Sequence, residues 1–339
     1  MKKILTVTIP SYNVEQYLNQ TLDSFIEESI MEDIEVLIVD DGSKDTTAAI
    51  GREYESRYPG TFRVISKENG GHGSTINRGA AEASGTYFKV VDGDDWVNTK
   101  DFAALVQALK TCDADYVLTN YYEVNDQTGE LTEKEFKRLK KGEMPPNVYL
   151  SFEEVAAKMQ IPMHALVIKT SILKDNQIRL DEHCFYVDVE YVLYPIPYVE
   201  KIAYFDLYVY MYRLAVTTQS VSIQGFQKHI QNHIDVIYHL TEFFEKYAAT
   251  GVDPVKASYI GKRIAQMVGD QVTIFMSYGA GSKWAKEEFI MFDQKLKGIS
   301  SKIYELSGEE SGALRMLRKT GFMGYGLIVK ASMKRNNVE

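Results

Sequence analysis

Three aspartates within four residues form the part of the sequence best suited to chemistry. Asp92, Asp94 and Asp95 follow the run 87–91, and Gly93 separates the first two of them. The β-branched and aromatic residues of that run predict a buried strand that ends at the glycine. Like charges this close repel one another unless a cation lies between them, and carboxylate oxygens suit Mg²⁺ or Mn²⁺. A solvated acidic turn is the alternative, since aspartate and glycine both favour turns.

Polar residues also follow three earlier strand-like runs. These polar ends are Ser11-Tyr12-Asn13, Asp40-Asp41 and Asn69-Gly70-Gly71. Apolar residues at helical spacing lie between the runs, and strands joined by helices predict an α/β fold with a mostly parallel sheet flanked by helices. Ligands of such sheets bind beyond the carboxyl ends of the strands, where all four polar clusters fall. This coincidence favours a ligand and metal site over a plain turn.

These motifs, in this order, resemble those of family 2 glycosyltransferases with the GT-A fold. The matching segments are Ile9-Pro10-Ser11-Tyr12-Asn13, Ile38-Val39-Asp40-Asp41-Gly42-Ser43, Asn69-Gly70-Gly71, Asn77-Arg78-Gly79 and Asp92-Gly93-Asp94-Asp95. The resemblance extends over residues 4–222. It implies a UDP-sugar donor, a divalent metal cofactor, Mn²⁺ or Mg²⁺, and transfer of the sugar with inversion.

The resemblance also assigns roles to individual side chains. It implies that Asp94 is the main metal ligand, that Asp92 contacts the metal or the ribose, and that Asp95 contacts the donor sugar. The other residues that we expect to bind the nucleotide sugar are Pro10, Tyr12, Asn13, Asp41, Asn69, Gly70, Asn77 and Arg213. Among them Tyr12 offers a flat face to the pyrimidine, Asp41 an acceptor for the ring N–H, and Arg213 a clamp for the pyrophosphate. The chain departs from the family by having Ile76, where an arginine is common.

An inverting displacement needs a general base beside the acceptor hydroxyl. The family commonly has a Glu-Asp pair at the start of a helix for this role, and Asp188 matches the aspartate. The preceding residue is Val187 rather than glutamate. Glu190 is the weaker candidate, since a helical residue two positions on points away from Asp188. The structural alternative is a first-turn aspartate that the helix dipole favours. His164 could face the sugar or only pack beside an apolar run.

Charge and cysteine content exclude several classes of protein. The formal net charge of −9 argues against nucleic-acid binding, which needs a basic face. The two cysteines, Cys112 and Cys184, are too few for a disulfide framework or a zinc cluster, and they fit a reducing cytosol. The sequence predicts neither a signal peptide nor a transmembrane helix. We therefore expect a cytoplasmic protein, with the inner face of the membrane as a second location to test.

Two regions are expected from the pattern of strands and helices. Residues 1–224 form the nucleotide-sugar-binding and catalytic domain, and residues 225–339 are mainly helical, with an acceptor, oligomer or membrane-surface role. Within the second region, residues 312–335 combine apolar and basic side chains in an otherwise acidic protein. That stretch is a candidate for peripheral contact with an anionic membrane. Helix packing and self-association as a homo-oligomer are equal alternatives.

The expected function is transfer of a sugar from a UDP-sugar to a hydroxyl of a cell-surface or exopolysaccharide glycan, free or lipid-linked. Two other functions stay open. A non-catalytic nucleotide-sugar-binding assembly subunit is supported only by the missing glutamate before Asp188. A sugar nucleotidyltransferase shares nucleotide-binding sheets and acidic metal sites. It would usually carry a glycine-rich, basic loop after the first strand, where this chain has Pro10-Ser11-Tyr12-Asn13.

Overall fold

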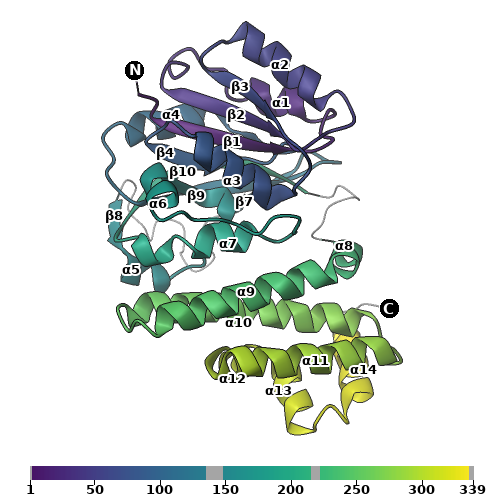
Figure 1. Cartoon of the computed structure of the whole chain (residues 1–339). Coiled ribbons are helices and arrows are strands. Elements are labelled where there is room, and N and C mark those ends of the chain that lie inside the picture. Colours follow the sequence, from purple (N-terminus) through teal and green to yellow (C-terminus); the bar gives the residue numbers. More distant parts are fainter. Residues whose placement is uncertain (1, 135–147, 215–221, 336–339) are drawn as a thin grey trace. The chain divides into compact units, whose positions relative to one another are not determined.

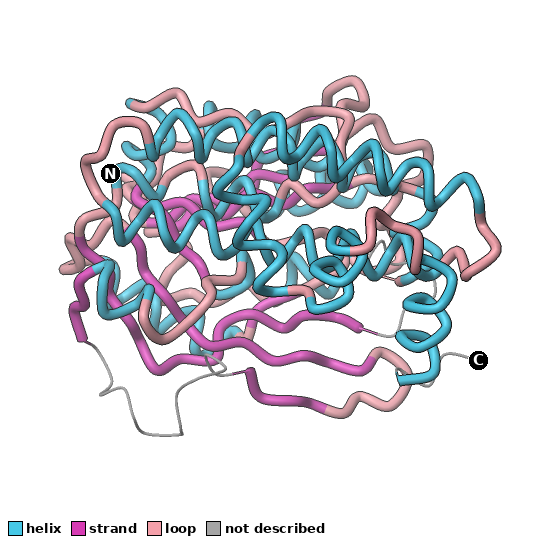
Figure 2. The backbone as a smooth tube through the Cα atoms, turned by 90° about the horizontal axis from the view of Figure 1, so that it is seen from below, coloured by secondary structure: helices cyan, strands magenta, loops and turns pink. Residues whose placement is uncertain are grey.

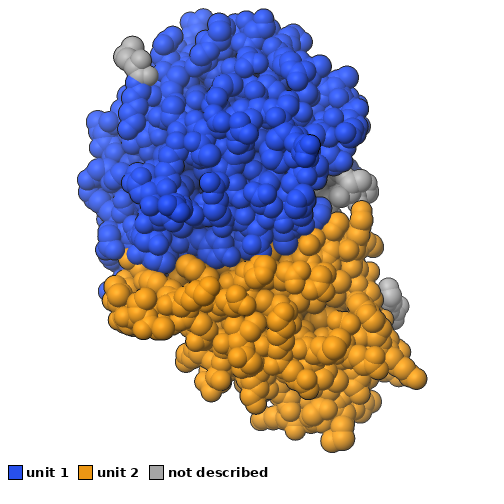
Figure 3. All heavy atoms as spheres, viewed as in Figure 1, with its two compact units in different colours: residues 1–216 blue, residues 217–339 orange. Residues whose placement is uncertain are grey.

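The computed structural model describes residues 2–134, 148–214 and 222–335, with side chains up to residue 332. The chain divides into two compact units, Met1–Val216 (unit 1) and Thr217–Glu339 (unit 2) (Figure 3). The domain boundary expected after residue 224 lies inside α8 (Ile223–Lys228).

Unit 1 is built on a ten-stranded sheet (Figure 1). Eight strands follow one another in the order β3-β2-β1-β4-β9-β6-β10-β5, while β7 pairs with β6 and β8 pairs with β10. The pairs β1–β2, β1–β4, β2–β3 and β6–β10 are parallel, while β5, β7, β8 and β9 run antiparallel to their partners. The strands are β1 (Leu5–Ser11), β2 (Ile34–Asp40), β3 (Phe62–Ser66), β4 (Tyr87–Val90), β5 (Trp96–Val97), β6 (Tyr116–Asn125), β7 (Leu131–Lys134), β8 (Val148–Ser151), β9 (Leu166–Lys169) and β10 (Lys201–Leu214). The predicted α/β fold class is confirmed.

Helices cover both faces of this sheet because the side chains of its strands alternate between the two faces. Leu5 and Val7 of β1 belong to the same apolar core as Leu22 and Phe102, which come from helices on one face. Thr8 points to the opposite face, where a Cβ built at Gly79 would lie 2.1 Å from its hydroxyl. The helices of unit 1 are α1 (Leu18–Asp23), α2 (Thr47–Arg57), α3 (His72–Glu82), α4 (Thr99–Leu109), α5 (Phe152–Ala156), α6 (Thr170–Asp175) and α7 (Asp188–Leu193).

Unit 2 is helical in its described residues (Figure 2). After α8 it contains α9 (Ile230–Ala248), α10 (Pro254–Ser277), α11 (Lys283–Ile299), α12 (Ser301–Glu310), α13 (Gly312–Lys319) and α14 (Tyr325–Arg335). Helices α10 to α13 each begin after a side chain that accepts hydrogen bonds from the free N–H groups of the first turn, namely Asp253, Ser282, Ser300 and Ser311. Stacking of Phe275 on Phe289, with ring centroids 4.8 Å apart, joins α10 to α11. Among the described helices, none is long and apolar enough to cross a membrane.

Candidate active site

The carboxyl ends of four parallel strands bring the predicted polar clusters to one edge of the sheet. Ser11 at the end of β1 pairs with Asp40 at the end of β2, which in turn pairs with Ser66 at the end of β3. The turn after β4, residues 92–95, contains the three aspartates and is called the acidic turn below. It lies next to β1, because the N–H of Gly93 donates to the carbonyl of Pro10 at 3.1 Å. The strand ends therefore position side chains that are far apart in the sequence.

Strand β10 fixes the acidic turn through hydrogen bonds to Asp95. Asp95 is buried, and its two carboxylate oxygens accept hydrogen bonds from the Tyr210 hydroxyl at 2.6 Å and from the Arg213 N–H at 2.7 Å. Burial, followed by the charges of Asp94 and Asp92, raises the pKa of Asp95 well above its usual value. Asp95 thus fixes the geometry of the turn in this structure, while its predicted contact with the donor sugar stays a prediction.

Asp92 and Asp94 are partly exposed beside this anchor. Burial and then the charge of Asp92 raise the pKa of Asp94 to about 6. Burial also opposes the charge of Asp92, but the nearby His72 outweighs that effect and holds the pKa of Asp92 below its usual range. A second positive charge at this position would favour ionised Asp94 in the same way.

His72 lies 3.0 Å from Asp92, measured between its Nε2 and Oδ1 of the carboxylate. It is the first residue of α3 and follows Gly71, whose φ of 83° suits glycine. Although burial alone would lower it, the charges of Asp92, Asp188 and Asp94 raise the pKa of His72. The sequence-based prediction missed this histidine; its position directly after the Asn69-Gly70-Gly71 motif was the available signal.

His164 packs against three tyrosines, one of which is Tyr121 with its ring centroid 5.5 Å away. Its ring stacks on Tyr212 at 4.1 Å and lies edge-on to Tyr210 at 4.8 Å. Burial lowers the pKa of His164 to about 4, so the imidazole is neutral at pH 7. Among the described residues, one ligand atom each from Asp92, Asp95 and His164 lie within 4.8 Å of one another. This group shares Asp92 with the predicted metal site but has Asp95 and His164 where the prediction has Asp94.

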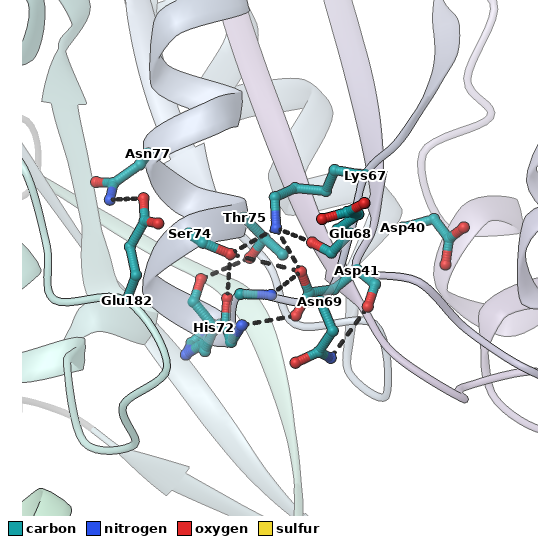
Figure 4. A network of polar contacts seen from close by, with 12 residues as sticks. Asp40, Asp41, Lys67, Glu68, Asn69, His72, Ser74, Thr75, Asn77 and Glu182 are labelled. Carbon is teal, nitrogen blue, oxygen red and sulfur yellow. Dashed lines mark hydrogen bonds and ion pairs between the residues drawn. The ribbon is translucent and has the colours of Figure 1, made fainter.

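Asp41 organises the loop that follows β3 (Figure 4). Its Oδ1 lies 2.6 Å from Nζ of Lys67 and accepts the N–H of Gly70 at 2.9 Å, while its Oδ2 accepts the N–H of Gly71 at 2.8 Å. Nδ2 of Asn69 donates to the backbone carbonyl of Asp41 at 3.0 Å. The structure therefore brings Asp41, Asn69 and Gly70 together as predicted, and it uses the Asp41 carboxylate to shape the loop.

Tyr12 and Asn13 lie where β1 leaves the sheet. The ring of Tyr12 is half-exposed and available to a ligand. Asn13 has a φ of 54°, and its Oδ1 accepts the N–H of Lys44 at 2.8 Å. Its own N–H donates to the Ser43 hydroxyl at 3.0 Å. The loops after β1 and β2 are thereby held against each other at the predicted nucleotide side of the site.

Close packing joins α3 to the segment before α7. A Cβ at Gly73 would lie 2.0 Å from the carbonyl oxygen of Asp181, so only glycine permits this approach. Asn77 of α3 adds hydrogen bonds to Leu180 and to Glu182, the latter at 3.2 Å (Figure 4). This attachment holds the predicted base segment against α3, across 103 residues of sequence.

Asp188 begins α7 and is partly exposed. Its charge contributes to the raised pKa values of His72 and Tyr212, so it lies near the histidine that contacts Asp92. Glu190, the weaker candidate, is fully buried, and its Oε2 accepts the N–H of Asp181 at 2.8 Å. Burial raises the pKa of Glu190 to about 8, which suits a protonated structural group.

Residues 6–170 match the family model described as Glycosyl transferase family 2. This segment of the chain belongs to glycosyltransferase family 2. Glycosyltransferase GlyA of Streptococcus pneumoniae is 36% identical over 125 residues, which are 37% of this chain and 18% of GlyA. The uncharacterized glycosyltransferase EpsJ of Bacillus subtilis is 34% identical over 122 residues, 36% of this chain and 35% of EpsJ. The matched segments thus cover a minor part of each relative.

The structural likeness to a solved protein extends beyond those segments. The crystal structure of S. aureus TarS 1–349 in complex with UDP-GlcNAc matches 98% of this chain and 92% of that one, with a TM-score of 0.67 at 16% identity. This likeness concerns the fold alone. It includes the helical unit 2, which the family model does not reach.

Arg213 has hydrogen-bond partners within the protein that the sequence did not predict. The guanidinium of Arg213 is almost fully buried and donates to the carbonyl of Asp94 at 2.6 Å and to Oε1 of Gln20 at 2.8 Å. It also pairs with Asp126 and lies over the ring of Trp96 at 4.7 Å. Arg213 therefore anchors the acidic turn in this structure, whereas its contact with pyrophosphate stays a prediction.

Proposed function

We propose that the chain transfers a sugar from a UDP-sugar to a hydroxyl of a glycan acceptor, with inversion and with the help of a divalent metal. The observation that carries the proposal is the contact of His72 with Asp92, 3.0 Å apart, beside Asp94 in the turn that follows parallel strand β4. Asp188 contributes to the raised pKa of the same histidine. Family membership supports sugar transfer, and the UDP-GlcNAc complex of the fold relative TarS supports a UDP-linked donor. A cell-surface or exopolysaccharide glycan, free or lipid-linked, is the proposed acceptor on the strength of the family resemblance.

The residues present fit a hard divalent cation. Asp92 and Asp94 offer carboxylate oxygens in a confined setting, where the charge of one already raises the pKa of the other. We assign Asp94, with Asp92, to hold the metal, because both oxygens of Asp95 already accept hydrogen bonds from β10. When bound, Mn²⁺ or Mg²⁺ would neutralise the charge that develops on the departing diphosphate.

The donor nucleotide is assigned to the loops after β1, β2 and β3. Tyr12 presents a half-exposed ring on which a pyrimidine can stack, and Pro10 and Asn13 shape the same turn. The rigid loop at Asn69 and Gly70 brings backbone close to the ligand, with Asp41 holding it in place. Stacking and backbone contacts select the nucleotide, while the identity of the sugar depends on the pocket around it.

The acceptor hydroxyl is assigned to Asp188. A partly exposed carboxylate can accept the hydroxyl proton as the oxygen attacks the anomeric carbon from the face opposite the diphosphate. The charge of Asp188 also contributes to the raised pKa of the neighbouring His72. Asn77 and Gly73 hold the segment before Asp188 against α3, the helix that follows the loop at Asn69 and Gly70.

The direct test is release of UDP from a panel of UDP-sugars in the presence of Mn²⁺. We expect release from at least one donor, its loss with EDTA, and a fall of roughly 100-fold or more in Asp94→Asn. Asp175→Asn, which changes an exposed aspartate of α6, should behave like the parent chain.

Absence of UDP release from every donor would overturn the proposal of sugar transfer from UDP. Release that is indifferent to both EDTA and Asp94→Asn would overturn the metal assignment alone. Pyrophosphate formed from a nucleoside triphosphate and a sugar phosphate would identify a nucleotidyltransferase instead.

A further inference from the structure

The end of unit 2 exposes apolar and basic side chains together. Helices α13 and α14 are in contact with each other (Figure 1). Met316 on α13, Met323 between the helices and Leu327 on α14 are 53%, 87% and 77% exposed. Grouped exposed apolar side chains are typical of interaction sites. Three basic side chains on the same elements are also exposed. Together the six residues form what we call the basic–apolar surface: Arg315, Met316, Lys319, Met323, Leu327 and Lys330.

The remaining side chains of this segment are committed to packing. Five of its apolar residues are buried: Leu314, Leu317, Phe322, Tyr325 and Val329. The guanidinium of Arg318 is almost fully buried and donates to Oδ1 of Asp293 at 2.7 Å, which ties α13 to α11. The side chains of 312–335 are therefore divided between the core of unit 2, as the helix-packing alternative predicts, and the exposed surface. Lys334 and Arg335 lie beyond the described side chains.

The backbone presents the basic–apolar surface as two short stripes. On α13, Lys319 follows Arg315 and Met316 by four and three positions, which places the three on one side of the helix. Between the helices, Gly321 and Phe322 both adopt positive φ, 55° and 61°. This turn packs the Phe322 ring against Phe289 at 5.2 Å and is followed directly by the exposed Met323. Leu327 follows Met323 by four positions, and Lys330 follows Leu327 by three.

The charge of this segment is opposite to that of the whole chain. No aspartate or glutamate occurs between Glu310 and Glu339, although the formal net charge of the chain is −9. Exposed apolar side chains flanked by lysine and arginine, without acidic residues, match the two requirements of an anionic bilayer. The apolar groups enter the acyl boundary, and the cations pair with the lipid phosphates.

We propose that the basic–apolar surface binds the face of an anionic lipid bilayer. The proposal rests on the exposure and charge of α13 and α14 and does not depend on the catalytic assignment. It concerns contact with the headgroup and outer acyl region, since the described helices do not span a membrane.

The test is sedimentation of the full chain with vesicles of phosphatidylcholine, alone or mixed with phosphatidylglycerol. We expect binding to the anionic vesicles only, and weaker binding as salt is raised. The triple variant Arg315→Gln, Lys319→Gln, Lys330→Gln should lower the partition coefficient by about tenfold or more. The double variant Met323→Ser, Leu327→Ser should lower it by a similar factor.

Matched controls lie on neighbouring helices of the same unit. Met291→Ser on α11 and Lys302→Gln on α12 change exposed residues of the same types and should leave vesicle binding unchanged. All variants should keep the helical circular dichroism of the parent chain. Failure to sediment with anionic vesicles, or equal binding by all variants, would overturn the proposal. So would lipid-free self-association that Met323→Ser, Leu327→Ser abolishes, which would identify a second copy as the partner.

Discussion

The side chain of Asn77 forms two hydrogen bonds with the backbone of Leu180. Its Oδ1 accepts the N–H of Leu180 at 2.9 Å, and its Nδ2 donates to the Leu180 carbonyl at 2.9 Å. Asn77 is buried on α3, while Leu180 precedes the segment that leads to Asp188. One asparagine thus joins α3, which follows the loop assigned to the donor, to the segment that we assign to the acceptor.

Replacement of Asn77 by alanine should therefore act on positioning. Because it leaves the N–H and the carbonyl of Leu180 without their partner, we expect the free energy of unfolding to fall by roughly 1–3 kcal/mol. Sugar transfer should fall further than the affinity for UDP, measured by calorimetry. Asn176→Ala, which removes only a local bond to Ile172, is the matched control. Loss of UDP affinity at unchanged stability would show that Asn77 contacts the nucleotide directly.

This residue illustrates what the sequence could predict. The motif located Asn77 at the site, because order along the chain and the strand–helix alternation determine which residues reach the end of the sheet. It did not reveal the partner, since Leu180 is 103 positions away and its approach depends on tertiary packing at Gly73. His72 was missed for the same reason, because its contact with Asp92 joins two loops that are distant in sequence.

Arg213 offers a test of anchoring against phosphate binding. Lysine at this position keeps the charge but loses the planar fork that reaches Asp94, Gln20 and Asp126 at once. We expect Arg213→Lys to lower the free energy of unfolding by roughly 1.5–3 kcal/mol, as measured by urea denaturation.

The affinity of the folded variant for UDP should change by less than about threefold, a difference below 1 kcal/mol. Arg78→Lys, at an exposed arginine paired with Glu82, is the control and should change stability by less than about 0.5 kcal/mol. A large loss of UDP affinity without loss of stability would restore Arg213 to the role of pyrophosphate clamp.

Lys89 is a buried lysine of β4, the strand that leads to the acidic turn. The sequence indicated only that it belongs to a strand. Its Nζ donates to the carbonyls of His164 at 2.8 Å and Leu166 at 3.3 Å. Burial lowers the pKa of Lys89 to about 7. The folded chain therefore binds fewer protons than the unfolded chain between pH 7 and the ordinary lysine value of 10.5, and stability contributed by this group rises with pH in that window.

Comparison with Lys89→Met isolates this contribution. From pH 7 to pH 9, the free energy of unfolding of the parent chain minus that of Lys89→Met should rise by up to about 1.4 kcal/mol per pH unit. Below pH 7 the difference between the two chains should level off. The exposed Lys100→Met should give a difference that does not vary with pH. A flat difference for Lys89→Met as well would contradict burial of a titrating lysine.

Asp188 is proposed as the base for transfer of a sugar from a nucleotide sugar that the loops after β1, β2 and β3 bind. The decisive measurement is UDP release by Asp188→Asn from the donor that the panel identifies, together with calorimetric UDP binding. We predict that release falls by about 100-fold or more while UDP affinity and unfolding temperature stay unchanged, because only the proton acceptor is lost. Asp175→Asn should match the parent chain. Full release by Asp188→Asn, or equal loss of release and UDP binding, would contradict the assignment.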